Sequence, residues 1–232
     1  MTGGWLLAID TATSVVNVAA GDADGSLRAA RTFAAEHRHG SHLLPAIDAL
    51  LETEGLSLAG LRGVVVGLGP GAFTGLRVGL ATAKTLAHAL GIPIVGVSTA
   101  EVLLAAEAEE AAGDASDVAA APERELLLPA GPHDRVRIVP GGTPRLETGA
   151  IVPERPGAVA VDLDGRASEA ALARGRRALH GFPAALLRLG AARLGAVGSD
   201  DVERLVPEYV SLPRGVTTDL GEGGVAWSRD PR

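Results

Sequence analysis

Short apolar runs separated by turn residues dominate the start of the chain. Residues 6–9, 15–20 and 26–34 form three such runs, joined by a Thr-Ser turn and an Asp-Ala-Asp-Gly turn. Turns of a few residues between apolar runs are typical of an antiparallel meander. The pattern therefore predicts three successive strands at the beginning of the fold.

A helical period then replaces the strand pattern. Apolar residues recur at three- and four-residue spacings on one face, at Leu43, Leu44, Ile47, Leu50 and Leu51. This spacing predicts an amphipathic helix. Pro45 falls in its expected first turn, where the missing N–H costs little.

The next segment alternates buried strands with a helix. Residues 63–68 form a continuous apolar run, which is expected of a strand covered on both faces, and residues 94–97 read as the following strand. Between them, Thr74 is a good N-cap for a helix over residues 75–90. Strands on either side of a helix indicate a parallel part in the sheet.

A third helix is expected directly after the last of these strands. Ser98 and Glu101 have the spacing of a capping box, and the helical pattern runs to Ala112. The element order is then three strands, helix, strand, helix, strand, helix. This order predicts a mixed α/β lobe.

After Gly113 the periodicity of apolar residues becomes less regular. Short strands are expected at residues 125–128, 135–139 and 158–163, and helices at residues 168–179 and 184–194. We expect a first lobe over residues 1–112, a smaller second lobe over residues 113–216 and a disordered polar tail over residues 217–232.

The helix predicted over residues 75–90 is apolar around most of its circumference. One side carries Leu76, Leu80, Ala83, Ala87 and Leu90, and the other side carries Val78, Ala81, Thr82, Thr85 and Ala89. One stripe would suffice to dock the helix on a sheet, so a second apolar face indicates a partner helix. With the preceding helix it would form a two-helix surface for a second protein, and ordinary packing within the chain is an equal alternative.

The amino-acid composition excludes several kinds of functional site. The chain has no cysteine, which excludes disulfides, thiolate zinc sites and thiol catalysis. A net charge of −7 argues against a surface that holds a polyanion by itself, and Lys84 is the only lysine. No basic region precedes the first apolar run, and no apolar run approaches the ~20 residues of a membrane span. We therefore expect a cytoplasmic protein without a membrane anchor.

Two turns have the build of phosphate-binding loops. Asp10 and Thr11 end an apolar strand, where a carboxylate beside backbone N–H groups can position a metal-bound phosphate. The second loop carries Gly69, Gly71, Thr74 and Gly75, and places a helix N-terminus behind flexible backbone amides. It lacks the Walker lysine and the acid of a dinucleotide fingerprint. A hairpin turn and a tight strand-to-helix connection are the alternatives.

Other candidate sites are sparse. His37, His39 and His42 have a spacing that could hold a metal, with a solvated helix start as the alternative. His88 and the remaining histidines stand alone, so no second ligand cluster is evident. The sequence also has no Gly-x-Ser-x-Gly elbow. We therefore assign no catalytic residue and no metal ligand.

Four motifs occur in a fixed order, and together they carry a resemblance to a known family. They read Leu-Ala-Ile-Asp-Thr-Ala-Thr from residue 7, His-Gly-Ser-His-Leu-Leu-Pro from residue 39, Gly-Leu-Gly-Pro-Gly-Ala-Phe-Thr-Gly-Leu-Arg-Val-Gly from residue 67, and Gly-Val-Ser-Thr from residue 96. Over residues 5–104 the chain resembles the bacterial TsaB (YeaZ) family, the dimerisation subunit of the tRNA threonylcarbamoyladenosine-modifying complex. Pro207 and Tyr209 resemble that family's terminal Pro-x-Tyr strand.

The resemblance implies a fold and a role. The fold is that of actin, sugar kinases and heat-shock ATPases, with two lobes, each built on a five-stranded mixed sheet flanked by helices. The role is that of a non-catalytic scaffold for TsaD, the subunit that holds the metal and modifies the adenosine beside the anticodon. The ATPase TsaE is the other protein of the system, so ATP or ADP and metal are expected in the partners and none in this chain. Transfer RNA is reached only through the complex.

The resemblance also implies an interface, on the first two helices, that pairs with TsaD and can self-pair into a homodimer. By position it falls on His39, Leu43, Leu44, Ile47, Leu51, Val78, Leu80, Ala83, Lys84 and Ala87. The phosphate-style loops at Asp10, Thr11, Gly69, Gly71, Thr74 and Gly75 are then vestigial.

One departure and three alternatives stay open, and one of the alternatives is a purely self-associating structural homodimer without a heterologous partner. The family's Asp-Ala-Arg-Arg-x-x-Glu-Val-Tyr hairpin corresponds to residues 120–127, which lack its Asp and Tyr. A second alternative is an ATP-dependent phosphotransferase that uses Asp10 and the loop at Gly69. The third is a metal-dependent hydrolase that uses the histidines at 37, 39 and 42.

Overall fold

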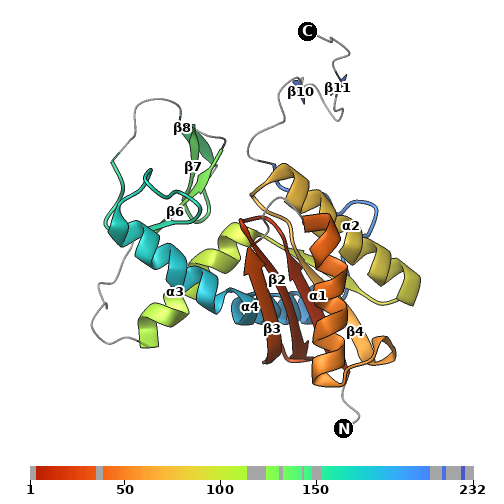
Figure 1. Ribbon diagram of the computed structural model, residues 1–232. Helices are drawn as coiled ribbons and strands as arrows, with labels where there is room; N and C mark the ends of the chain where they lie inside the picture. Colours follow the sequence, from red (N-terminus) through yellow and green to blue (C-terminus); the bar gives the residue numbers. More distant parts are fainter. Residues whose placement is uncertain are drawn as a thin grey trace.

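The first sheet has the strand order β3-β2-β1-β4-β5 (Figure 1). Its strands are β1 (Trp5–Asp10), β2 (Val15–Asp22), β3 (Leu27–Ala34), β4 (Leu61–Gly67) and β5 (Ile94–Val97). The first three pair antiparallel, whereas β1 with β4 and β4 with β5 pair parallel. The predicted meander and the predicted parallel part are both confirmed.

The computed structural model describes most of the chain. It covers residues 4–34, 39–113, 124–130, 133–142, 144–147, 153–209, 216–217 and 226–227.

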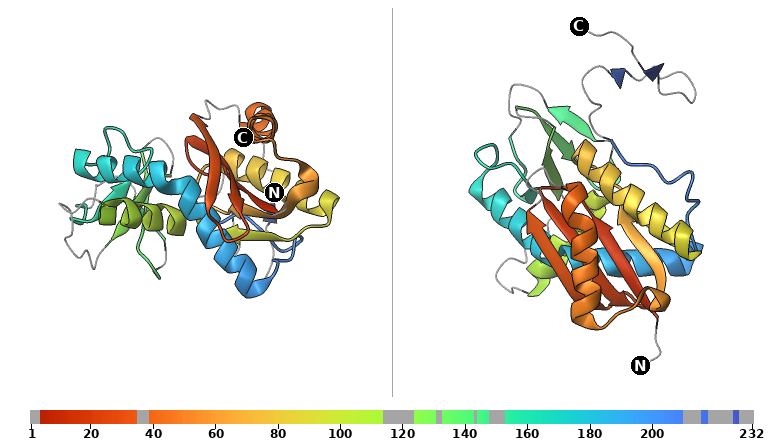
Figure 2. Two further views of the ribbon diagram at one scale, coloured as in Figure 1. Left: turned by 90° about the horizontal axis from the view of Figure 1, so that it is seen from below. Right: turned by 45° about the vertical axis from the view of Figure 1, so that its right-hand side comes forward.

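Helices cover both faces of the first sheet, which explains its continuous apolar strands. On one face α1 (His39–Glu54) and α2 (Phe73–Leu90) lie side by side (Figure 2, right). They share a buried cluster with Trp5, Leu7 and Ile9 of β1. The alternate β1 residues face the other side, where α4 (Glu169–Val197) packs.

A smaller sheet with the order β8-β7-β6-β9 forms the other half of the molecule. Its strands are β6 (Glu125–Pro129), β7 (Arg135–Ile138), β8 (Arg145–Glu147) and β9 (Ala158–Ala160). The β6–β9 pair is parallel and the other two pairs are antiparallel, so this sheet is also mixed. Four described strands stand where the family resemblance implied five. The predicted fold class, two helix-flanked mixed sheets, is confirmed.

Two helices span the junction between the sheets. The helix α3 (Thr99–Gly113) packs against α4 and contacts β6, while α4 contacts β9 at one end and the first sheet along the rest (Figure 2, left). The following segment returns to the first sheet, where the Asp200 N–H donates to the Ile94 carbonyl over 2.8 Å. The division into lobes at residue 112 stays a prediction.

The predicted break in the last helical region was wrong. Residues 168–179 and 184–194 belong to one continuous 29-residue helix, α4, with Pro183 inside it. A proline inside a helix costs about 3 kcal/mol. Phe182 and Leu186 beside it are buried in the core between the sheets, and this packing outweighs the cost.

Two predicted helix starts were also wrong. The helix α1 begins at His39, so Pro45 lies inside it, on an exposed position where only one backbone hydrogen bond is lost. The helix α2 begins at Phe73 after Ala72, with no side-chain cap, so Thr74 is an exposed residue of its first turn. The Ala72 N–H donates to the Ala12 carbonyl, which fixes the point where α2 starts.

The chain's last part lies largely outside the described residues, including most of the predicted tail 217–232. Val216–Thr217 (β10) and Ala226–Trp227 (β11) pair antiparallel.

A short 3-10 helix, Leu58–Gly60, precedes β4. Among the described helices, none combines the length and apolar character that crossing a membrane requires.

Replacing Phe182 by alanine tests the importance of the α4 packing. Phe182 is 1% exposed, and such a truncation lowers the free energy of unfolding by about 3–5 kcal/mol. Urea unfolding followed by circular dichroism measures the loss. Leu146→Ala, at a leucine that is 53% exposed, is the control and should change stability by no more than ~0.5 kcal/mol. Equal effects of the two changes would contradict the assigned core.

Candidate functional site

Asp10 lies at the end of β1 with no exposed surface. Its Oδ1 accepts the Ala12 N–H over 2.9 Å, and its Oδ2 accepts the Thr99 hydroxyl over 2.6 Å. The Thr99 Oγ1 in turn accepts the Gly69 N–H over 3.0 Å. Burial raises the pKa of Asp10 to about 6, and the hydrogen bonds from Thr99 and Ala12 oppose this rise. The carboxylate therefore connects β1, the glycine loop and the start of α3.

The glycine loop packs directly on the turn that follows β1. A Cβ at Gly71 would lie 2.1 Å from the Ala12 carbonyl oxygen, and one at Gly79 would lie 2.2 Å from the Thr11 Oγ1. Thr11 donates its hydroxyl proton to the Gly75 carbonyl over 2.7 Å. Side chains at these glycines would separate α2 from the sheet. The loop has the geometry of a tight connection packed on neighbouring backbone.

Two of the loop's amides are used inside the chain. The Gly69 N–H donates to Thr99, and the Ala72 N–H donates to the Ala12 carbonyl over 2.7 Å. The structure thus brings Asp10, Thr11 and the loop glycines together as the sequence indicated, but it leaves Thr74 pointing to solvent.

Ser98 does not have the predicted capping role. Its hydroxyl contacts the Gly69 carbonyl at 3.3 Å and the Glu208 Oε2 at 3.1 Å instead of capping α3. The Glu208 N–H also donates to the Leu68 carbonyl over 2.7 Å. Residues near the chain's end thus hold the glycine loop from the side opposite Asp10.

Tyr209 continues this contact to the start of α2. Its ring packs on Phe73 with 5.1 Å between ring centroids, and its hydroxyl accepts the Arg77 Nε–H over 3.3 Å. The Arg77 guanidinium lies 3.9 Å above the Phe73 ring, a cation–π contact. The sequence singled out Tyr209 through the family motif, but not its contact with Phe73 and Arg77.

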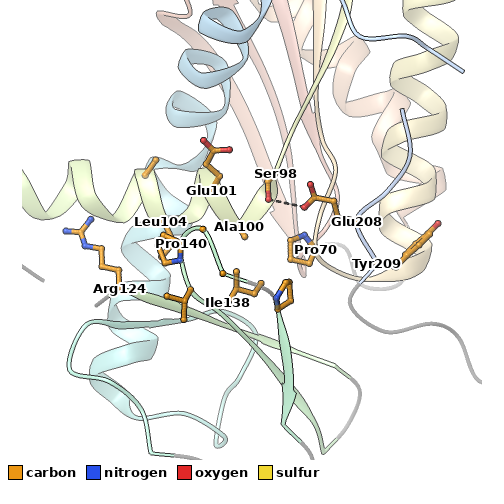
Figure 3. A pocket seen from close by; sticks show the side chains of 15 residues that line it. Pro70, Ser98, Ala100, Glu101, Leu104, Arg124, Ile138, Pro140, Glu208 and Tyr209 are labelled. Atoms are coloured by element: carbon orange, nitrogen blue, oxygen red, sulfur yellow. Dashed lines mark hydrogen bonds between the residues drawn. The ribbon is translucent and has the colours of Figure 1, made fainter. Parts of the chain in front are cut away.

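A cavity of about 790 Å³ lies between the two halves of the molecule (Figure 3). Pro70, Leu104, Ile138 and Pro140 supply apolar walls, and Glu101, Arg124, Glu208 and Tyr209 supply the polar groups. Arg124 is paired with Glu107 at 3.7 Å, whereas the two glutamates form no ion pair within the described residues. The cavity therefore has a negative rim.

Ser14 and Asp162 join the two halves directly. The Ser14 N–H donates to the Asp162 Oδ2 over 2.7 Å, and the Ser14 hydroxyl donates to the other carboxylate oxygen. Asp162 has a φ of 58°, the one positive value at a non-glycine residue in the described chain. No local pattern in the sequence could reveal this contact, because the residues are 148 positions apart.

The predicted interface residues fall into two groups. Five of them, Leu43, Ile47, Leu80, Ala83 and Ala87, are at most 6% exposed and pack in the chain's own core. Leu44 is 57% exposed, while Leu51, Val78 and Lys84 are half-buried. The His39 side chain lies outside the described residues. Of the predicted residues whose side chains are described, a partner can reach only the second group, together with other exposed residues of α1 and α2.

The histidine cluster is described only in part. His37 lies outside the described residues, and His42 is exposed beside the Phe33 ring at 6.2 Å. Within the described residues, no group of three or more histidines and acids has metal-binding geometry.

Comparison with known proteins agrees with the motifs. A family model described as "TsaD: tRNA N6-adenosine threonylcarbamoyltransferase" matches residues 33–139. The Escherichia coli tRNA threonylcarbamoyladenosine biosynthesis protein TsaB is 39% identical over 94 residues, which are 40% of each chain. The Bacillus subtilis protein of that name is 37% identical over 43% of each chain.

A solved structure extends the likeness to nearly the whole fold. YeaZ from Pseudomonas aeruginosa superimposes with a TM-score of 0.64 at 22% identity, over 89% of this chain and all of that one. The chain is thus similar in sequence to the TsaB (YeaZ) family over less than half of its length, and its fold is that of YeaZ. The aligned sequence spans less than half the length of the curated relatives it matches.

The buried Asp10 carboxyl predicts a specific pH dependence. Its pKa rises from an ordinary 3.8 to about 6 on folding, so the folded chain holds this proton more tightly than the unfolded chain. The contribution of Asp10 to the free energy of unfolding has its full value below about pH 4. It decreases by roughly 2–3 kcal/mol as the pH rises through the folded-state pKa of about 6. Asp10→Asn should remove that fall in urea titrations between pH 4 and 7. An unchanged difference between variant and wild type across this range would contradict the prediction.

The Ser14–Asp162 contact predicts a difference between two substitutions. Asp162→Gly removes the contact but suits the positive φ, whereas Asp162→Ala also adds backbone strain of about 1–2 kcal/mol. Both should speed amide hydrogen exchange near Ser14, and the alanine variant should be the less stable. If neither variant changes exchange at residues 11–15, the contact does not hold the two halves together.

Proposed function

We propose that this chain is a non-catalytic subunit that supports threonylcarbamoylation of the tRNA adenosine beside the anticodon. It pairs with the TsaD subunit through the outer surface of α1 and α2, and it works alongside TsaE. The observation that carries the proposal is the use of both phosphate-style turns to hold α2 on the sheet. Sequence similarity over about two fifths of the chain supports it, since the Escherichia coli and Bacillus subtilis relatives are named for threonylcarbamoyladenosine biosynthesis.

The surroundings of Asp10 argue against phosphotransfer by this chain. Both carboxylate oxygens accept hydrogen bonds, and the side chain has no exposed surface. A phosphate at the glycine loop would have to displace Thr99 from the Gly69 N–H. The two unpaired glutamates at the nearby cavity would also repel a polyphosphate. The ATP-dependent phosphotransferase is therefore the less supported function.

The outer surface of α1 and α2 has the features of a protein contact. Leu44 on α1 is 57% exposed, and small residues, Thr74, Ala81 and Thr85, are exposed along α2. Small side chains let a partner helix approach closely, and a large exposed leucine gains by being covered. In this proposal nucleotide and metal act in the partner subunits, tRNA is bound by the complex, and the assembly works in the cytoplasm.

Ala81→Glu tests the assigned surface. Ala81 is exposed near the middle of α2, so the variant should fold normally and lose at least tenfold in affinity for TsaD. Co-purification with TsaD, and tRNA modification in a reconstituted reaction with TsaE, measure the effect.

The matched control is Ala196→Glu, at an exposed alanine of α4 on the opposite side of the sheet. This variant should bind and support modification like the wild type. Equal binding by the Ala81 variant and the wild type would refute the surface. A wild-type chain that neither binds TsaD nor raises modification would refute the proposed function itself.

A further inference from the structure

The cavity between the two halves of the molecule has no part in the function proposed above. Its volume of about 790 Å³ lies within the range of cavities that hold small organic molecules. Neither α1 nor α2 contributes a residue to its lining. The cavity is therefore a second candidate site, separate from the proposed partner surface.

Both halves of the chain contribute apolar side chains to this cavity. Pro70 comes from the glycine loop and Leu104 from α3, while Ile138 ends β7 and Pro140 follows it closely (Figure 3). An apolar molecule between these side chains would be removed from water on two sides. Its burial is favourable in proportion to the area that loses contact with water.

Three polar residues, Ser98, Glu101 and Glu208, lie together at one edge of the cavity (Figure 3). The Glu208 Oε2 accepts the Ser98 hydroxyl over 3.1 Å, and Glu101 lies in the first turn of α3 directly after Ser98 and Thr99. The same three polar residues also line a second cavity of about 270 Å³. They therefore lie where the two spaces meet.

The charge at this edge is negative. Both glutamates are exposed, and neither forms an ion pair within the described residues. The two arginines that line the cavities are each paired with a different acid, Arg124 with Glu107 at 3.7 Å and Arg193 with Asp200 at 3.0 Å. A cation at this edge would meet two carboxylates that no basic side chain of the described chain contacts.

We propose that the cavity binds a small organic cation, a molecule with an apolar body and a protonated amine or amidine group. The apolar body packs between Leu104 and Ile138, and the cationic group binds the carboxylates of Glu101 and Glu208. Hydrogen bonds between an ionised donor and a carboxylate are stronger than neutral ones, so the charged group gives the site its selectivity. The inference goes beyond the proposed function and does not rest on it.

Three probes of the same shape test the site on the full chain. Benzamidine is a cation with an aromatic body, benzamide is its neutral counterpart, and benzoate is an anion. Methyl NMR of isoleucine-labelled protein reports on the cavity, because Ile138 lines it while Ile9 and Ile47 are buried in the core of the first sheet. Benzamidine should shift the Ile138 signal saturably at millimolar concentration, and the other two probes should bind about fivefold more weakly or worse.

The probes also define the results that would overturn the inference. Equal binding of benzamide and benzamidine would show that the carboxylates do not select a cation. Benzamidine that leaves the Ile138 signal unchanged would show that the cavity is not its site. Mg-ATP, a polyanion of similar aromatic character, should not shift this signal, and a larger shift with Mg-ATP than with benzamidine would also overturn the inference.

Neutral substitutions locate the cationic group. Glu101→Gln and Glu208→Gln preserve the shape of the side chain, and each should weaken benzamidine binding about threefold or more without changing benzamide binding. Glu203→Gln is the matched control, because Glu203 is exposed on the same segment as Glu208 and does not line the cavity. Benzamidine binding that is unchanged in both cavity variants, or equally weakened in the control, would contradict the assigned contacts.

Discussion

The hydrogen bonds that join Asp10, Thr99 and Gly69 hold three segments of the fold in one geometry. Asp10 ends the central strand, Gly69 lies in the glycine loop, and Thr99 begins α3. The carboxyl is fully buried, so its bonds are strong and their loss would leave a polar group without a partner in the core. The raised pKa shows that burial acts against the charged form, and the Thr99 hydroxyl offsets part of that cost. The position of α2 depends on this arrangement, because its first turn follows the loop directly.

The same arrangement separates the two sides of α2. Thr11 lies so close to Gly79 that the helix axis is held against the sheet, and Leu80 and Ala83 are buried there. The outer side is left with small and basic residues, which suit a protein contact better than a chemical reaction. The Glu208 N–H donates to the Leu68 carbonyl next to Gly69, and Tyr209 packs on Phe73 at the start of α2. The packing of the loop and of Glu208 and Tyr209 thus fixes the start of α2 from both sides.

Local pattern predicted the first sheet well because each of its strands is a short apolar run bounded by turns. The motifs around Asp10 and Gly69 predicted the fold class. The partner residues stay a prediction, and periodicity defines the two faces of α2 but not which one contacts the sheet. Leu80 and Ala87 were assigned to the partner and lie in the core. Two separate helices were expected over residues 168–179 and 184–194, although packing from both sheets keeps α4 continuous. The strand β8 has three residues, too few for any periodicity, and was missed.

Hydrogen–deuterium exchange of the chain with and without TsaD tests most directly whether α1 and α2 form the partner surface. Exchange is measured on peptides that cover α1, α2 and the second sheet. The account predicts that TsaD slows exchange over residues 39–54 and 73–90 and leaves β6 and β7 unchanged. Slower exchange confined to the second sheet or the cavity between the halves, with α1 and α2 unaffected, would contradict it.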